Sequence, residues 1–132
     1  MSQKVLDSHA LLAFFENEKG ADKVAELIRQ ARDRDKPLLL TAVNWGEVLY
    51  IAARASGHAA AVKIEEIMDT LPIEIVPVDR AIAKLAAEFK TTKKMSYADC
   101  FAAALAKLKK ADLITGDPEF KAVANEIHIC WL

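Results

Sequence analysis

The sequence predicts an α/β fold in which a parallel sheet is covered by helices on both of its faces. Short apolar runs alternate along the chain with longer segments whose apolar residues recur at helical spacing, a pattern typical of strand–helix–strand units. No internal repeat, low-complexity tract or linker interrupts this alternation. A length of 132 residues also suits one folded unit, so we expect residues 1–132 to form a single domain.

The first half of the chain contains two predicted strands and four predicted helices. Val24, Leu27 and Ile28 fall on one face of a helix that ends in a polar run at 32–36. Gly57 is placed to end the helix that follows the second strand. The expected order is a strand at 5–6, a helix at 8–16, a helix through 24–31, a strand at 38–41, a helix reaching 56 and a helix at 58–70.

The second half of the chain contains three predicted strands and three predicted helices. Asp79 is a favoured N-cap residue, and the apolar residues from Ile82 to Phe89 recur at i, i+3, i+4 and i+7. The expected order is a strand at 73–76, the helix capped by Asp79, a loop at 90–94, a helix at 96–110, a strand at 113–115, a short helix at 118–125 and a strand at 127–130.

The composition excludes some classes of protein. With 18 basic and 19 acidic residues the chain is not a general polycation, although a local basic patch remains possible. Cys100 and Cys130 stand in apolar surroundings, which favours reduced, buried thiols over a disulfide or a metal pair. The chain reaches Asp7 before any apolar signal segment forms, and no apolar run approaches the ~20 residues that span a bilayer. We therefore expect a cytoplasmic protein with no membrane partner.

Four acids stand in stretches that otherwise carry almost no charge: Asp7, Glu47, Asp99 and Asp117. A helix that is apolar all round is normally buried, and a buried carboxylate must be neutralised or paired. Helix capping is one explanation, because Asp7 and Asp117 precede predicted helices and Ser96-x-x-Asp99 and Asn44-x-x-Glu47 fit capping boxes. Four independent caps, however, have no reason to meet at one point.

The predicted connectivity brings three of these acids to one edge of the sheet. Asp7 and Asp117 end the first and fourth strands, and Glu47 begins the helix after the second, at the carboxyl edge where ligands bind in open parallel sheets. Asp99 begins the helix that feeds the fourth strand, and connectivity predicts the opposite edge for it. Two carboxylates ~4 Å apart repel by about 4 kcal/mol at an effective dielectric near 20, so a cluster must take up protons or bind a cation. Oxygen ligands without cysteine or histidine favour Mg²⁺ or Mn²⁺ over Zn²⁺.

Four motifs together resemble, in order and spacing, the acidic motifs of PIN-domain nucleases, and most closely those of VapC-type toxins of bacterial toxin–antitoxin pairs. The resemblance covers essentially the whole chain. It implies a three-layer α/β/α fold with a parallel five-stranded sheet of order 3-2-1-4-5, and it brings Asp99 into the acid cluster. The motifs are Val5-Leu6-Asp7-Ser8, Asn44-Trp45-Gly46-Glu47, Ser96-Tyr97-Ala98-Asp99 and Leu113-Ile114-Thr115-Gly116-Asp117.

The resemblance also implies roles for single residues. Asp7, Asp99 and Asp117 would be metal ligands, Glu47 would bind the metal or orient water at it, and Thr115 would support the catalytic site. His9 is expected on a helix surface and outside the chemistry. RNA binding would need positive charge, which the loop residues Lys90, Lys93 and Lys94 offer, although a plain solvated loop explains them equally well.

The function implied by the resemblance is an Mg²⁺- or Mn²⁺-dependent endoribonuclease that hydrolyses RNA phosphodiester bonds as the toxin of a toxin–antitoxin pair. Its partners would be RNA, an antitoxin protein of the same operon and a second copy in a homodimer. The antitoxin is expected to lay an apolar segment along the helices beside the site and to deliver a basic side chain to the acids. Two alternatives remain: a PIN-type RNA-processing nuclease without antitoxin, and a non-catalytic module that binds a basic peptide in the acidic pocket. The helix residues expected to meet an antitoxin are Leu11, Leu12, Phe14, Phe15, Trp45, Leu49 and Tyr50.

Overall fold

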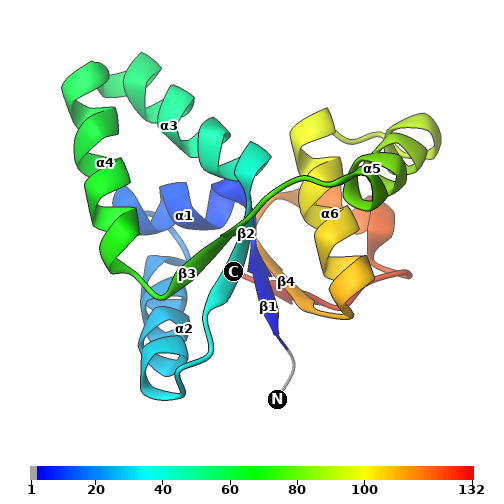
Figure 1. Ribbon diagram of the computed structural model, residues 1–132, viewed down its shortest axis with the longest axis horizontal. Coiled ribbons are helices and arrows are strands. Elements are labelled where there is room, and N and C mark those ends of the chain that lie inside the picture. The colour runs from blue at the N-terminus through cyan, green and yellow to red at the C-terminus, as the bar shows by residue number, and fades with distance from the viewer. Residues whose placement is uncertain (1–2) are drawn as a thin grey trace.

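The computed structural model describes residues 3–132 and places a five-stranded parallel sheet between two groups of helices (Figure 1). The strand order is β3-β2-β1-β4-β5, and each neighbouring pair is parallel. This confirms the predicted three-layer fold and sheet order. The strands are β1 (Lys4–Leu6), β2 (Leu38–Thr41), β3 (Ile73–Val76), β4 (Asp112–Thr115) and β5 (Ile129–Trp131).

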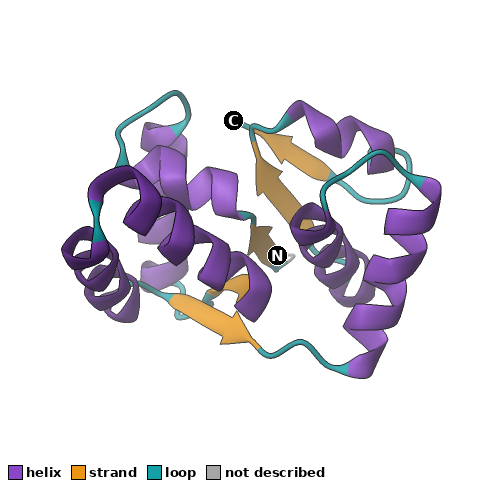
Figure 2. Cartoon of the chain, turned by 90° about the horizontal axis from the view of Figure 1, so that it is seen from above, coloured by secondary structure: helices purple, strands orange, loops and turns teal. Residues whose placement is uncertain are grey.

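The helices separate into two groups, one on each side of the sheet (Figures 1 and 2). Four of them form the first group: α1 (Ser8–Phe15), α2 (Ala21–Asp33), α3 (Ala42–Ser56) and α4 (His58–Thr70). The second group contains two α-helices and one 3-10 helix: α5 (Arg80–Thr92), α6 (Tyr97–Lys109) and η1 (Pro118–Val123).

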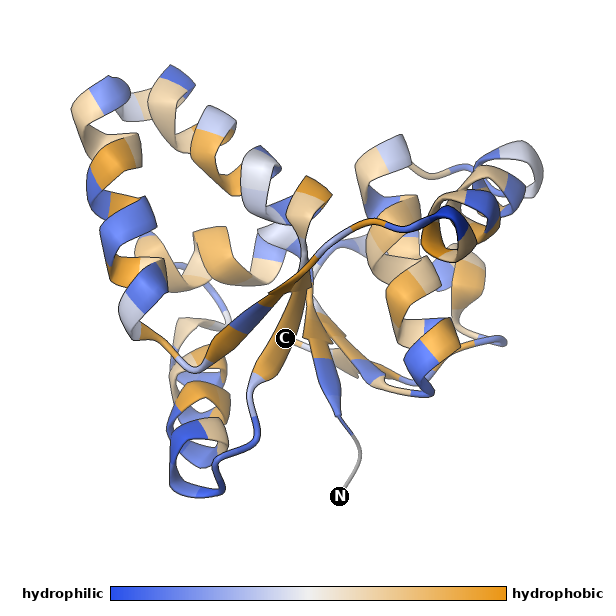
Figure 3. Ribbon diagram, viewed as in Figure 1, coloured by the Kyte–Doolittle hydropathy of each residue, from blue (hydrophilic) through white to orange (hydrophobic). Residues whose placement is uncertain are grey.

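The central strands β2, β1 and β4 are buried on both faces, whereas the edge strands β3 and β5 are partly exposed. Alternate residues of a strand point to opposite sides of the sheet. One face packs against α5, α6 and η1, and the other packs against α1 to α4. The central strands are accordingly almost continuous in apolar residues, as Figure 3 shows, which is typical of covered parallel sheets. The first face carries Val5, Leu39 and Leu113, and the second carries Leu6, Leu40 and Ile114.

The structure differs from the predicted elements near residue 90 and at the end of the chain. The loop expected at 90–94 is helical as far as Thr92. The hydroxyl groups of Thr91 and Thr92 donate to the carbonyl groups of Ala87 and Glu88 one turn earlier, so the helix satisfies these polar side chains. The last helix is a 3-10 helix, and the last strand starts at Ile129 rather than at 127. None of the helices within residues 3–132 is both long and apolar enough to cross a membrane.

Candidate metal centre

Asp7 follows β1 directly and its side chain is completely buried. Its two carboxylate oxygens have different partners. Oδ1 accepts the backbone N–H of Ala10 at 2.8 Å, so Asp7 is the N-cap of α1 as the sequence favoured. Oδ2 accepts the hydroxyl group of Thr115 at 2.5 Å. The cap therefore uses one oxygen, and the second points to the end of β4, where further acids lie.

Thr115 connects the loop after β1 to the loop after β4. Its Oγ1 donates to Asp7 and accepts the backbone N–H of Asp117 at 2.9 Å. Asp117 is in turn the N-cap of η1, because its Oδ1 accepts the N–H of Glu119 at 2.9 Å. Thr115 thus binds both acids: its hydroxyl group contacts the side chain of Asp7 and the backbone N–H of Asp117.

Asp99 reaches the same place from the first turn of α6, and its side chain is also buried. Single carboxylate oxygens of Asp99, Asp117 and Glu119 all lie within 4.8 Å of one another. A separation of this size allows one cation to be shared by several oxygen ligands. The loop after β4 and the start of α6 therefore converge on one acidic cluster, and Asp7, outside this three-oxygen group, lies close enough for its charge to act on Asp99.

Asp99 lies at the carboxyl edge of the sheet, so the opposite edge that connectivity predicted for it is wrong. α6 ends at Lys109 and β4 begins at Asp112, so the helix delivers the chain to the amino end of that strand. A helix that runs antiparallel to the strand it feeds begins at the carboxyl end of the strand, and Figure 1 shows α6 in this orientation. The first turn of α6 consequently lies at the same edge of the sheet as Asp7 and Asp117.

Glu47 occupies the second turn of α3 and accepts a hydrogen bond from the hydroxyl group of Ser8. It is half-buried, and its charge acts on Asp7. Ser8 is buried at the start of α1, so the loop that carries Asp7 also orients Glu47. All four predicted acids therefore lie in one neighbourhood, although only Asp99 and Asp117 belong to the tight three-oxygen group, and Asp7 and Glu47 lie outside it.

The capping box expected at Asn44 and Glu47 is not present. Thr41 is the N-cap of α3 and accepts the N–H of Asn44 at 3.0 Å, while its hydroxyl group donates to Asn44 Oδ1 at 2.6 Å. Asn44 is completely buried, and its Nδ2 donates to the carbonyl group of Ala98 at 3.2 Å. Asn44 thus ties α3 to the residue that precedes Asp99, and the capping explanation for Glu47 is wrong.

Burial changes the protonation of the two most enclosed acids. It raises the pKa of Asp7 to about 7, and the charges of Asp117 and Glu47 act in the same direction, against the hydrogen bonds from Thr115 and Ala10. Burial likewise raises the pKa of Asp99 to about 7, with the charge of Asp117 as the next cause. Without a cation, these two carboxyl groups therefore retain protons close to neutral pH.

Glu119 is a member of the cluster that sequence reasoning missed. Its Oε1 accepts the backbone N–H of Ser96 at 2.9 Å. In a capping box this N–H would bind the side chain of Asp99, while Ser96 Oγ accepts the Asp99 N–H, as it does here at 3.2 Å. The carboxylate of Glu119, from η1, therefore accepts the N–H that the Asp99 side chain would bind in a complete capping box. The signal in the sequence was a second acid two residues after Asp117, but an acid next to Pro118 at the start of a predicted helix is an ordinary first-turn residue.

The three lysines predicted for RNA binding do not form one loop. Lys90 belongs to α5, and its Nζ donates to the carbonyl group of Met95 at 2.8 Å. Lys93 pairs with Glu126 at 3.1 Å, and Lys94 is exposed. Since two of the three already bind groups of the protein, they are weaker candidates for phosphate contacts than an open loop would have been.

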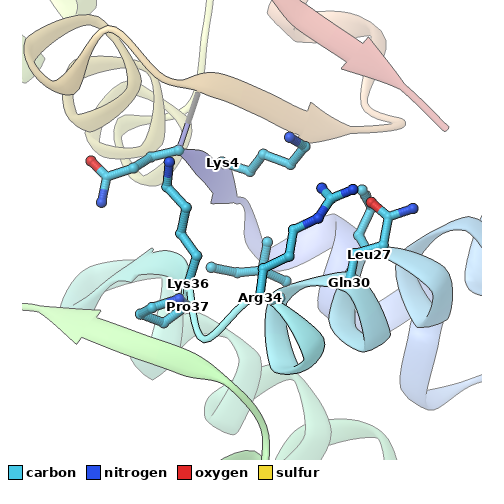
Figure 4. A pocket seen from close by; sticks show the side chains of 9 residues that line it. Lys4, Leu27, Gln30, Arg34, Lys36 and Pro37 are labelled. Carbon is cyan, nitrogen blue, oxygen red and sulfur yellow. The ribbon is translucent and has the colours of Figure 1, made fainter. Parts of the chain in front are cut away.

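A basic hollow at the amino edge of the sheet does not compete with the acid cluster as a substrate site. It lies beside the starts of β1 and β2, and Lys4, Arg34 and Lys36 surround it (Figure 4). Its volume of about 30 Å³ accommodates roughly two water molecules. A nucleotide does not fit there.

A family model for the PIN domain matches residues 4–126, which is nearly the whole chain. The chain belongs to the PIN domain family. No curated protein sequence matches it.

Solved structures with the same fold include several toxin–antitoxin proteins. Mycobacterium tuberculosis VapC20, described as a toxin that cleaves the sarcin–ricin loop, has a TM-score of 0.71 at 18% identity, covering 92% of this chain and 95% of that one. VapBC2 from Rickettsia felis, bound to a promoter DNA fragment, has a TM-score of 0.74 at 15% identity and 98% coverage of both chains. FitAcB from Neisseria gonorrhoeae has a TM-score of 0.69 at 18% identity and 96% coverage of both. At these identities the likeness establishes the fold.

The raised pKa values predict an unusual pH dependence for the metal-free PIN domain. With folded-state pKa values about 7 for Asp7 and Asp99, against an ordinary 3.8, the folded protein binds more protons than the unfolded chain between about pH 4 and pH 7. These two groups therefore lower the free energy of unfolding as pH rises through that window. In EDTA, we expect the melting temperature to fall by several degrees from pH 5 to pH 7.5.

Asp7→Asn should flatten this decline, and Asp79→Asn, at the N-cap of α5, should leave it unchanged. Differential scanning calorimetry of the three proteins across the pH range makes the comparison. Equal slopes in the wild type and Asp7→Asn would show that the buried carboxyl group does not retain a proton.

The hydrogen bond between Glu119 and Ser96 leads to a second prediction, which concerns the stability of the first turn of α6. Glu119→Ala should destabilise the first turn of α6 by about 1 kcal/mol, because the Ser96 N–H loses its acceptor. Glu119→Gln keeps a carbonyl oxygen at this place and should retain most of the stability. Thermal unfolding and amide hydrogen exchange at Ser96 measure both effects. If the Ser96 amide exchanges no faster in Glu119→Ala than in the wild type, the bond does not hold this turn.

Proposed function

We propose that this PIN domain is a divalent-metal-dependent endoribonuclease that hydrolyses phosphodiester bonds in RNA. One observation carries the proposal: carboxylate oxygens of Asp99, Asp117 and Glu119, from separate elements, lie within 4.8 Å of one another at the carboxyl edge of the sheet, with the buried Asp7 beside them. Burial and neighbouring charge raise the pKa of Asp7 and Asp99 to about 7, so a cation at this edge would compete with protons. A structural cap has no need of such an arrangement, because one carboxylate is enough to cap one helix.

The donor set suits a hard divalent cation. Only carboxylate oxygens converge in the cluster, which favours Mg²⁺ or Mn²⁺ over softer metals. Asp7, Asp99 and Asp117 would hold the ion, and Glu119 offers a further oxygen. When bound, such an ion lowers the pKa of water and neutralises charge that develops on a phosphate group.

The side chains around the acids hold them in place. The hydroxyl group of Thr115 and the N–H of Ala10 fix both oxygens of Asp7, so this carboxylate cannot rotate freely. Ser8 orients Glu47 toward the same region, where Glu47 would accept a proton from attacking water or position that water. Fixed donors of this kind are the usual way in which a protein keeps catalytic groups within a productive geometry.

We further propose that the protein is the toxin of a toxin–antitoxin pair and acts as a homodimer. The support is the resemblance of its motifs to VapC-type toxins and the fold shared with VapBC and FitAB proteins. Most of the side chains predicted to meet an antitoxin are only partly covered within the chain, but the prediction is wrong for Leu11, which belongs to the core. Leu11 is buried and Tyr50 is 50% exposed, whereas the rest are half-buried: Leu12, Phe14, Phe15, Trp45 and Leu49.

An RNA-processing nuclease without antitoxin, or a non-catalytic module that binds a basic peptide, remains the alternative to this proposal. A neighbouring gene for a short DNA-binding protein distinguishes a toxin from a processing enzyme. Metal-dependent cleavage of RNA distinguishes either enzyme from a binding module.

The acids are the first test of the nuclease. Asp7→Asn, Asp99→Asn and Asp117→Asn should each reduce RNA cleavage by at least about 100-fold while the protein stays folded, since each removes a charged ligand and relieves carboxylate repulsion. Mn²⁺ should raise the melting temperature of the wild type by mass action, and this increment should be lost in the variants.

Asp79→Asn serves as the control, because it alters an N-cap aspartate outside the cluster. Cleavage that persists in EDTA would exclude a metal-dependent reaction. Full activity in one of the three variants would remove that residue from the site, and a wild type that binds Mn²⁺ without cutting RNA would favour the binding module.

The antitoxin is tested by purifying the protein with the product of its neighbouring gene. An arginine of the partner would make a bidentate contact with the acids and would compete with the cation. We expect RNA cleavage and Mn²⁺ affinity to fall at least tenfold in the complex. Undiminished cleavage and Mn²⁺ binding while the partner stays bound would refute inhibition at the acids, even if the pair itself exists.

A further inference from the structure

A hollow of about 470 Å³ adjoins the acid cluster on the side of α1. Two of its lining residues are close in sequence to the acids: Gly116 in the loop after β4 and His9 in the first turn of α1. Gly116 lies between Thr115 and Asp117, and His9 follows Ser8, the residue that holds Glu47. A molecule whose phosphate meets the acids would therefore have this hollow next to it.

In the wall of the hollow nearest the acids, side chains pack closely against the backbone of glycine residues. A Cβ atom at Gly116 would lie 2.8 Å from Cε1 of His9, so the imidazole ring packs directly on the bare backbone of the β4 loop. Leu132 is held in the same wall, because its N–H donates to the carbonyl group of Thr115 at 3.0 Å. Its side chain also packs on Gly20, where a Cβ atom would lie 2.7 Å from that of Leu132. The hollow is thus formed in the absence of a ligand.

The hollow is lined by both apolar and charged side chains, which suits a flat ring that carries polar groups at its edge. Leu12, Ile51 and Leu132 supply aliphatic surface, and the exposed ring of His9 supplies a stacking surface. The lining also contains two carboxylates, those of Glu16 and Glu18, and one basic side chain, that of Lys19. Carboxylates disfavour a phosphate group here but accept hydrogen bonds from the exocyclic amino group of a base. The volume lies within the range of pockets that bind small molecules.

We propose that this hollow binds the nucleobase adjacent to the cleaved phosphodiester, stacked on His9, and that it prefers a base with an exocyclic amino group over uracil. The inference rests on the proposed ribonuclease function and adds a source of substrate selectivity to it. His9, which was expected to be an ordinary surface histidine of a helix, then acts in specificity while remaining outside the chemistry.

The first experiment needs no metal and no turnover. Nucleoside 5′-monophosphates are titrated into the ¹⁵N-labelled protein in EDTA, and the amide signals of Gly116 and Leu132 are followed. We expect CMP and AMP to bind at least threefold more tightly than UMP. His9→Ala should weaken CMP binding at least fivefold, and His9→Phe should restore it, because a phenyl ring keeps the stacking surface.

His58→Ala is the matched control, since His58 is an exposed histidine in the first turn of α4. In RNA cleavage assays, His9→Ala should raise KM while kcat changes less than twofold. Glu16→Ala should reduce the preference for amino-bearing bases when the 5′ ends of the fragments are sequenced. The exposed positions of His9 and Glu16 allow both variants to fold, which their melting temperatures verify.

The outcomes separate this inference from the proposed function. RNA cleavage with no nucleotide-dependent shift at Gly116 or Leu132, and an unchanged KM in His9→Ala, would overturn the base site and leave the nuclease intact. Nucleotide binding at these amides without RNA cleavage would support the base site and refute the nuclease. A His9→Ala variant that changes only the oligomeric state or antitoxin binding would assign the hollow to a protein contact and overturn the proposal.

Discussion

The structure depends on holding several carboxylates close together at one buried edge of the sheet. Asp7 is completely buried and Asp99 nearly so, and both face the charge of Asp117. Like charges ~4 Å apart repel by about 4 kcal/mol even at an effective dielectric near 20. Hydroxyl and backbone N–H donors offset part of this repulsion, and retained protons remove another part. A bound cation, or a basic side chain of a partner, would relieve the repulsion that remains.

The acids at this edge come from both helical layers, so their relative positions depend on how both layers pack on the sheet. Asp7 begins α1 on one side of the sheet, whereas Asp99 begins α6 on the other. Asn44 crosses between the layers, since it starts from α3 and donates to the carbonyl group of Ala98. Within residues 3–132 every fully buried polar side-chain atom has a hydrogen-bond partner, so the cost of burying this polar network is low. Loss of either layer would disperse the acids.

The sequence predicted the order of elements and the main acids, and it failed where the answer depended on geometry between elements. Isolated acids such as Asp7 and Asp117 were visible because their neighbours are apolar. Asp99 was assigned to the wrong edge because the direction of its helix was not taken from the strand it feeds. Glu119 was missed because its role requires Ser96, 23 residues earlier in the chain, and no local pattern reports that distance. Thr41 was missed as a cap because Asn44 offered an equally good side chain.

On the proposed function, two adjacent residues of α1 would have different roles, Ser8 in the chemistry and His9 in selectivity. Ser8 is buried and holds Glu47, whereas His9, one position later, is exposed and lines the hollow. Successive helix residues point about 100° apart, so a change at His9 leaves the direction of Ser8 unaffected. Surface substitutions usually alter stability by less than about 0.5 kcal/mol, whereas changes to a buried polar network cost more. On the proposed function, the exposed face of α1 could therefore be changed to accept another RNA base while the acid cluster stays as it is.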